Sequence, residues 1–263
     1  MLIVCNGMKR SGSTLQYNLA ASILAEASIG VGQGWVPREQ LDPQATPLLD
    51  WLADDECHAI KSHKLLPGTS QLLESGQLKV LYSFRDVRDV AASSIRTFDN
   101  VHNIEDACRL IDEAWAADAL LSNKPSVLRQ SYEQLTRNTP EAIAEICRFL
   151  SVELSKAAID RIAQHYAIDQ VQRNIERKKR IYRVREFFRP ILERLGLLML
   201  GRTVYRTLFS DQLREIKKSL VRDNHVSSNR GKSGAWDDIL SSEDLAMLQQ
   251  RYGAWLQANG YAE

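Results

Sequence analysis

The 263-residue chain has few cysteines, almost no net charge and no long apolar run. A formal net charge of +1 excludes the strong positive field by which some proteins bind nucleic acids or membranes. The four cysteines lie far apart without a CxxC pair, which excludes a zinc-ligand spacing or a disulfide framework and favours a reducing, cytoplasmic compartment. No apolar run reaches about 18 residues, so we expect no membrane-spanning segment, and the immediate strand pattern leaves no room for a signal peptide.

The remaining composition is that of a globular protein, with 44% hydrophobic and 25% charged residues. Internal repeats and low-complexity segments are absent from the sequence. The length suits one α/β domain or two small ones. We expect a single domain over residues 1–263, in which residues 169–222 form a helical insertion or lid.

The stretch LIVCNGMKRSGSTL, residues 2–15, carries the strongest local signal. LIVC is typical of a buried strand, NGMKRSG is a glycine-punctuated loop, and Ser13 begins a long helical pattern. This arrangement directs backbone N–H groups and a helix dipole at an anion. The stretch therefore predicts a phosphate site, with an ordinary strand-to-helix turn as the alternative. Its candidate ligands are Lys9, Arg10, Ser11, Gly12, Ser13 and Thr14.

Gly7 and Gly12 have the spacing of the GxxxxGK[ST] loop of nucleotide triphosphatases. Ser13, however, stands where that loop requires a lysine, so the match fails at its key chemical residue. We therefore expect a phosphate site of another type. A P-loop-type small-molecule kinase that uses ATP and Mg²⁺ stays open as an alternative.

Two polar side chains accompany a short strand expected at residues 59–62. Lys61 and His63 lie two residues apart, so on a strand they would share one face. Histidine titrates near neutral pH and can act as a general base, although a surface histidine beside lysines is the alternative. The glycine- and proline-rich stretch 30–47 predicts a surface loop, from which Trp35 would line a pocket or pack on its rim.

KVLYSF, residues 79–84, predicts the clearest internal strand, and RDVRDVAASS then begins a helix. Arg85 would lie at the carboxyl edge of the sheet, where open α/β sheets bind ligands, and its planar guanidinium suits phosphate. Ser93 follows about two helical turns later. Asp86, Arg88 and Asp89 are expected to form a charge network at the helix start.

Two later segments are basic. Residues 169–190 predict a helix with eight Lys or Arg between positions 171 and 190, which would bind phosphate, anionic lipid or an acidic partner, or form a solvated face. NHVSSNRGKSGAW, residues 224–236, combines glycine, serine and cations in a loop that suits a further anion contact. Ser241 and Asp244 then form a capping-box pattern for a last helix.

Five strings occur together along the chain: RSGST at 10–14, KSH at 61–63, RDVRDVAAS at 85–93, YEQL at 132–135 and RGKSGAW at 230–236. In this order they resemble the motifs of soluble sulfotransferases that depend on PAPS (3′-phosphoadenosine 5′-phosphosulfate). The resemblance implies a P-loop-like fold with a central parallel β-sheet flanked by helices. It also implies PAPS as co-substrate, PAP as the desulfonated product, and no metal.

By this resemblance His63 is the general base, and Lys61 and Arg10 stabilise the charge on the transferred group. The loop 9–14 would bind the 5′-phosphosulfate end of the donor. Its 3′-phosphate would bind to Arg85, Ser93 and Arg230, with Gly231 and Lys232 beside them, and Tyr132 would lie near the adenine. Two positions depart from the family: Arg10 replaces the usual lysine, so it stabilises charge rather than donating a proton, and Leu15 replaces a tryptophan that would stack on adenine.

The acceptor implied is a hydroxyl or amine of a small molecule, a metabolite or natural product of secondary metabolism. A carbohydrate or lipid head group is an alternative acceptor, and a nucleotide-binding module without catalysis is an alternative function. No nucleic-acid partner is expected, and a homo-oligomer is left open.

Overall fold

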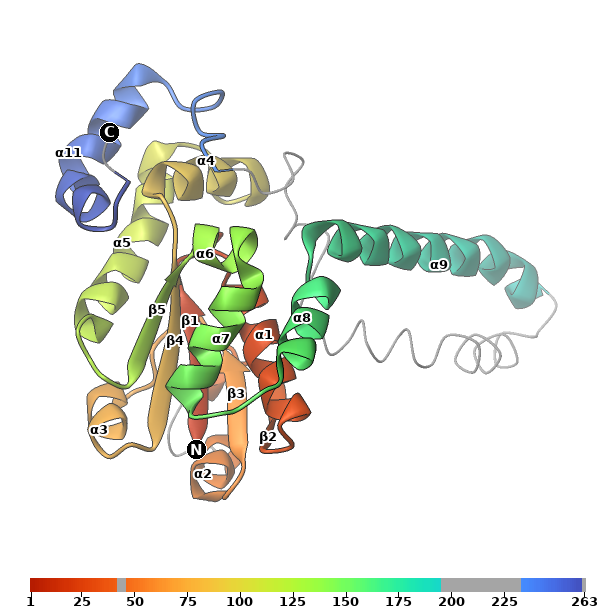
Figure 1. Ribbon diagram of the computed structural model, residues 1–263. Coiled ribbons are helices and arrows are strands. Elements are labelled where there is room, and N and C mark those ends of the chain that lie inside the picture. The colour runs from red at the N-terminus through yellow and green to blue at the C-terminus, as the bar shows by residue number, and fades with distance from the viewer. Residues whose placement is uncertain (42–45, 195–232, 262–263) are drawn as a thin grey trace.

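The computed structural model describes residues 1–41, 46–194 and 233–261. Its centre is a five-stranded parallel sheet with the order β2-β3-β1-β4-β5 (Figure 1). The strands are Gly30–Trp35 (β2), Cys57–Lys61 (β3), Leu2–Gly7 (β1), Leu78–Phe84 (β4) and Val127–Ser131 (β5). The predicted α/β class with a central parallel sheet flanked by helices is therefore confirmed.

Helices cover both faces of the sheet, because alternate residues of the central strands point to opposite sides. Leu2 and Val4 pack in one core cluster with α4 (Val87–Thr97), α5 (Ile104–Leu121) and α11 (Ser242–Ala258). Ile3 and Cys5 pack in a second cluster with α1 (Ser13–Glu26), α7 (Thr139–Leu150) and α8 (Lys156–His165). β1 is consequently buried along its whole length.

The remaining helices are short, apart from one. They are the 3₁₀ helix η1 (Arg38–Gln40), α2 (Thr46–Ala53), α3 (Thr69–Glu74), α6 (Tyr132–Arg137) and the long α9 (Ile168–Arg194). Side chains fix several helix starts: Asp86 accepts a hydrogen bond from Arg88 N, and Ser131 forms a capping box with Gln134. The capping box predicted at Ser241 and Asp244 is confirmed at the start of α11.

The prediction of a surface loop over residues 30–47 is wrong for its first six residues. Gly30–Trp35 form the edge strand β2, which pairs in parallel with β3 and shifts register between Gly32 and Gly34. Glycine-rich sequence is weak evidence for a strand. Here, however, the backbone of β2 lies so close to β3 that only glycine fits at position 30, since a Cβ there would lie 2.0 Å from the carbonyl oxygen of Cys57. Trp35 therefore belongs to the end of an edge strand.

The chain leaves neighbouring strands β1 and β4 in opposite directions, towards β2 and β5 respectively. Such a divergence opens a crevice at the carboxyl ends of the strands, which is where open α/β sheets bind ligands. The loops that follow β1 and β4 contain Arg10 and Arg85, so the topology brings these two predicted site residues together.

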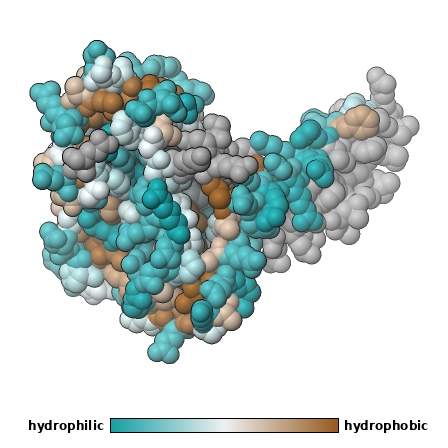
Figure 2. Space-filling view, turned by 45° about the horizontal axis from the view of Figure 1, so that its top comes forward, coloured by the Kyte–Doolittle hydropathy of each residue, from teal (hydrophilic) through white to brown (hydrophobic). Residues whose placement is uncertain are grey.

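The helix α9 projects away from the sheet and is mainly hydrophilic on the face seen in Figure 2. The predicted basic helix is thus present, while the rest of the proposed insertion, residues 195–222, lies outside the described residues. Among the described helices, none is long and apolar enough to cross a membrane.

Candidate functional site: the carboxyl edge of β1, β3 and β4

The loop after β1 is held close to β4 by contacts that only small residues permit. Gly7 has a φ of 148°, and an added Cβ would lie 2.3 Å from the carbonyl oxygen of Ser83. The buried hydroxyl of Ser11 lies 2.6 and 3.0 Å from the carbonyl oxygens of Met8 and Ser83, between which it shares its single proton, and 2.7 Å from the hydroxyl of Ser83, which can donate to it. Ser11 therefore turns its hydroxyl inward, and fixes the shape of the loop.

The helix α1 begins where that loop ends. Gly12 is its N-cap in a left-handed conformation, with a φ of 85°, and Ser13 and Thr14 form its first turn. The first N–H groups of a helix have no partner within it, and the helix dipole is positive there. The predicted strand, glycine loop and helix start are thus all present, and they leave an electropositive helix end at the edge of the sheet.

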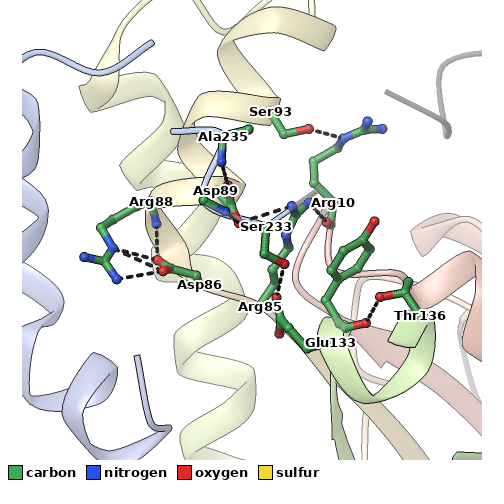
Figure 3. Close-up of polar contacts among 12 residues, drawn as sticks. Arg10, Arg85, Asp86, Arg88, Asp89, Ser93, Glu133, Thr136, Ser233 and Ala235 are labelled. Carbon is green, nitrogen blue, oxygen red and sulfur yellow. Dashed lines mark hydrogen bonds and ion pairs between the residues drawn. The ribbon is translucent and has the colours of Figure 1, made fainter. Parts of the chain in front are cut away.

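Two guanidinium groups converge beside this helix end. The Nε of Arg10 donates to the hydroxyl of Ser93, at 2.9 Å, and Arg85 Nη1 lies 3.4 Å from the carbonyl oxygen of Arg10 (Figure 3). Burial and the neighbouring Arg85 guanidinium lower the pKa of Arg10. Like charges gathered in a partly buried place are stabilised by an anion between them, so this cluster has the electrostatics of an anion site.

The structure thereby links two side chains, Arg10 and Ser93, for which the family resemblance implied contacts with opposite ends of the donor. Arg10 belongs to the loop after β1 and Ser93 to α4, yet their side chains are hydrogen-bonded. Lys9 and Arg10 also lie over the ring of Phe98, which sequence reasoning missed, at 5.7 and 6.0 Å from its centroid. No sequence pattern pointed to Phe98, because it lies just beyond the helix that contains Ser93.

Arg85 is buried at the end of β4, with 6% of its surface exposed. Its guanidinium pairs with Asp89, at 3.2 Å, and stacks 4.0 Å from the centre of the Tyr132 ring. Tyr132 in turn lies against Gly12, where an added Cβ would be 3.2 Å from the ring. Burial raises the pKa of Tyr132, so its hydroxyl stays neutral. Tyr132 therefore joins the loop after β1 to the loop after β4.

Lys61 and His63 form a second polar group at the end of β3. Lys61 Nζ lies 3.3 Å from His63 Nε2, and His63 Nδ1 lies 2.9 Å from the carbonyl oxygen of Gly7. The Trp35 ring completes the group, 5.5 Å from the His63 ring and 4.8 Å from Lys61 Nζ. Lys61 is buried, whereas Trp35 is 43% exposed. The group adjoins the loop after β1, because Gly7 is shared by both.

The segment before α11 returns to the same edge. The backbone N–H groups of Gly234 and Ala235 donate to the carboxylate of Asp89, and Ser233 donates to Glu133. The predicted charge network is present too, since Arg88 pairs with Asp86 at 2.8 Å. The remaining ligands predicted in this region, Arg230, Gly231 and Lys232, lie outside the described residues.

The site thus combines a strand, glycine loop and helix start, the arrangement that suits an anion, with a histidine–lysine pair. Among the described residues, no three or more His, Cys, Asp or Glu side chains gather as metal ligands. Fold and site together define an α/β protein of the P-loop-like class.

Comparison with protein families narrows this class. Residues 2–189 match the model of the sulfotransferase domain, which covers most of the chain. The chain therefore belongs to the sulfotransferase family, and the family and enzyme class predicted from the sequence are confirmed. A search of curated proteins found no match.

Solved structures share the fold at low sequence identity. Retinol dehydratase in complex with retinol and PAP is similar with a TM-score of 0.53 and 18% identity, over 97% of this chain and 81% of that one. Retinol dehydratase in complex with androsterone and inactive cofactor PAP is similar with a TM-score of 0.54 and 20% identity, over 97% of this chain and 80% of that one. Mouse sulfotransferase SULT7A1 complexed with PAP is similar with a TM-score of 0.59 and 15% identity, over 97% of this chain and 83% of that one.

Proposed function

We propose that this enzyme transfers the sulfuryl group of PAPS to a hydroxyl or amine of a small-molecule acceptor, with His63 as the general base. The observation that carries the proposal is the position of the histidine–lysine pair. It lies at the end of β3 and is hydrogen-bonded to Gly7, the last residue of β1, so that a basic nitrogen adjoins the loop proposed to bind phosphate.

The hydrogen bonds of His63 assign its tautomer. A carbonyl oxygen can only accept, so Nδ1 carries the proton and donates to Gly7. A lysine ammonium can only donate, so Nε2 accepts from Lys61 and holds a lone pair. Nε2 is therefore the basic nitrogen, and it would take the proton of an acceptor group that replaces Lys61 as its hydrogen-bond donor, as a general base requires.

The donor site is supported by the charges that surround it. PAPS, when bound, supplies an activated sulfuryl group. Arg10, Arg85 and the start of α1 offer cations and N–H groups for its phosphates, and Ser93 offers a hydroxyl. The mutual repulsion of Arg10 and Arg85 fits a site built for a multiply charged anion. Three PAP complexes among proteins of the same fold support this choice of donor.

Lys61 and Arg10 have separate tasks in this proposal. Lys61 lies against His63, so its ammonium can stabilise negative charge that develops next to the base. Arg10 keeps its charge throughout, because a guanidinium does not act as an acid in proteins. The kinase alternative loses support, since the chain lacks the P-loop lysine and belongs to the sulfotransferase family.

The half-exposed ring of Trp35 supports a small, partly apolar acceptor. It lies beside both members of the proton-transfer pair and presents an apolar surface there. A phenol, alcohol or amine held against this ring would place its polar atom near His63. A cytoplasmic location remains a prediction, supported by four free cysteines, three of them buried.

The test is incubation of the enzyme with PAPS and a panel of phenols, aliphatic alcohols, amines, sugars and lipid head groups, read by mass spectrometry. We expect a sulfonate to be added to at least one small acceptor and PAP to be released in equal amount. Sulfation of only the sugars or lipid head groups would shift the acceptor class to the alternative. Binding of PAP without any transfer would favour the non-catalytic module.

A further inference from the structure

Asp89 is a buried carboxylate beside the cationic side chains of the candidate site. Its exposure is 3%, and it lies next to Arg85 at the start of α4 (Figure 3). Burial raises the pKa of Asp89, which measures the energetic cost of keeping a charge there. A negative charge at this point weakens the positive potential that would attract phosphate, so its presence calls for a different explanation.

The contacts of Asp89 connect two distant parts of the chain. Oδ2 accepts from Gly234 N at 3.0 Å and Oδ1 from Ala235 N at 3.1 Å, while Oδ2 also pairs with Arg85 at 3.2 Å. One carboxylate therefore holds two successive N–H groups of the late segment and one guanidinium of the β4 loop. Both oxygens are needed for this, because each accepts one of the two backbone donors.

A second carboxylate holds the same segment from the opposite side. Glu133, on α6, accepts from the hydroxyl of Ser233 at 2.6 Å and from that of Tyr261 at 2.7 Å. Arg88 adds a third tie, since it donates to the carbonyl oxygen of Tyr261 at 2.8 Å and lies 4.5 Å from the centre of the Trp236 ring. Residues 233–236 are thus fixed between α4 and α6.

We propose that Asp89 is a positioning residue that assembles the 3′-phosphate half of the donor site, by holding residues 234 and 235 against Arg85. The inference rests on the proposed function, because it takes PAPS as the donor. Asp89 does not touch the donor itself. It sets the direction of the Arg85 side chain and fixes where the late segment meets the β4 loop.

Electrostatics and positioning predict opposite results for one substitution. Asp89→Asn removes a negative charge near a phosphate, so by charge alone PAP would bind more tightly. Asparagine, however, replaces one of the two acceptor oxygens by an NH2 group, which can only donate and would face the N–H group of Gly234 or Ala235. Positioning therefore predicts weaker binding, and the weakening is confined to ligands that carry a 3′-phosphate.

The experiment compares PAP with adenosine 5′-phosphate, which lacks the 3′-phosphate, by titration calorimetry on the full chain. For Asp89→Asn we expect the Kd of PAP to rise about tenfold or more, which corresponds to the loss of one charge-assisted hydrogen bond. The Kd of adenosine 5′-phosphate should stay within about twofold. Asp118→Asn is the matched control, since Asp118 is equally buried and bonds Arg129 and Trp255, each at 2.9 Å, neither of which is a predicted site residue. It should leave both Kd values unchanged.

A second variant removes one bond from the other side. Ala235→Pro deletes an N–H donor to Asp89 and keeps both the carboxylate and its ion pair with Arg85. It should show the same selective loss of PAP affinity, even where Asp89→Asn does not fold. Tighter binding of PAP by Asp89→Asn, or an equal loss for both nucleotides in either folded variant, overturns the inference. Failure of the unmodified protein to bind PAP overturns the proposed function instead.

Discussion

Replacement of His63 by asparagine separates the chemical role of this histidine from its structural role. The Asn Nδ2 atom is as many bonds from Cα as the histidine Nδ1, so His63→Asn can keep the 2.9 Å hydrogen bond to Gly7. The basic Nε2, which faces Lys61 at 3.3 Å, is lost. The substitution therefore removes the proposed base and leaves the link between β3 and the phosphate loop in place.

The expected size of the effect follows from that separation. A general base contributes about 10²–10⁴-fold to turnover, or about 3–5 kcal/mol of transition-state stabilisation. The hydrogen bond to Gly7 contributes about 0.5–1.5 kcal/mol of stability, which His63→Ala would lose and His63→Asn would keep. We thus expect turnover to fall at least 100-fold in both variants, with little change in Tm for His63→Asn.

The assay follows sulfonated product by mass spectrometry under saturating PAPS, together with calorimetry of PAP binding. His58→Asn is the control, because His58 lies on β3, the strand that precedes His63, and bonds Gln33 and Asp54, both at 2.9 Å. It should change turnover per folded molecule by less than about threefold. Turnover of His63→Asn close to that of the unmodified enzyme would refute the assignment of the base. Lost turnover with equally lost PAP binding would place the defect in the phosphate loop.

Three further substitutions probe the loop and the acceptor side. Trp35→Ala should raise the KM of the acceptor at least fivefold, an effect of about 1 kcal/mol, and leave the Kd of PAP unchanged. The reason is that the ring is 43% exposed and, among the described site residues, contacts the histidine–lysine pair. Unchanged acceptor kinetics would contradict this prediction. Gly7→Ala should lower the free energy of unfolding by about 3 kcal/mol or more in chemical denaturation, since the added Cβ would lie 2.3 Å from the carbonyl oxygen of Ser83. Ser11→Ala should lower the free energy of unfolding by about 1–3 kcal/mol, because the hydroxyl contacts with Met8 and Ser83 are lost. If the variant instead keeps its stability and binds PAP more weakly, the Ser11 hydroxyl is a ligand of the donor.

The sequence by itself determined the local parts of this molecule. A β-branched run, a glycine loop and a helix start at Ser13 are all encoded within residues 2–15, and each is present in the structure. Helix caps such as Ser241 with Asp244 are equally local, because the groups they satisfy lie within one turn. The family resemblance rested on such short strings, and the match of residues 2–189 to the sulfotransferase domain bears it out.

The edge strand β2 could not be predicted in this way. Its residues Gly30–Trp35 have weak strand propensity, and what makes them a strand is backbone pairing with β3, together with space that only glycine leaves beside Cys57 and Tyr17. The same holds for the inward hydroxyl of Ser11. A serine in this loop suited a phosphate ligand, so the sequence predicted that its hydroxyl would face the ligand. In the structure the hydroxyl contacts Met8 and Ser83 instead, which depends on the pairing of β1 with β4.

The tertiary structure alone decided which distant residues meet. Asp89 bonds Gly234 and Ala235, Glu133 bonds Ser233 and Tyr261, and Arg10 bonds Ser93, in each case across a long stretch of chain. A motif specifies the chemistry of a side chain, but its partner depends on strand order and helix packing, which one local pattern does not contain. The order β2-β3-β1-β4-β5 places the loops after β1 and β4 side by side, and this brings Arg10 and Arg85 together although they lie far apart in the sequence.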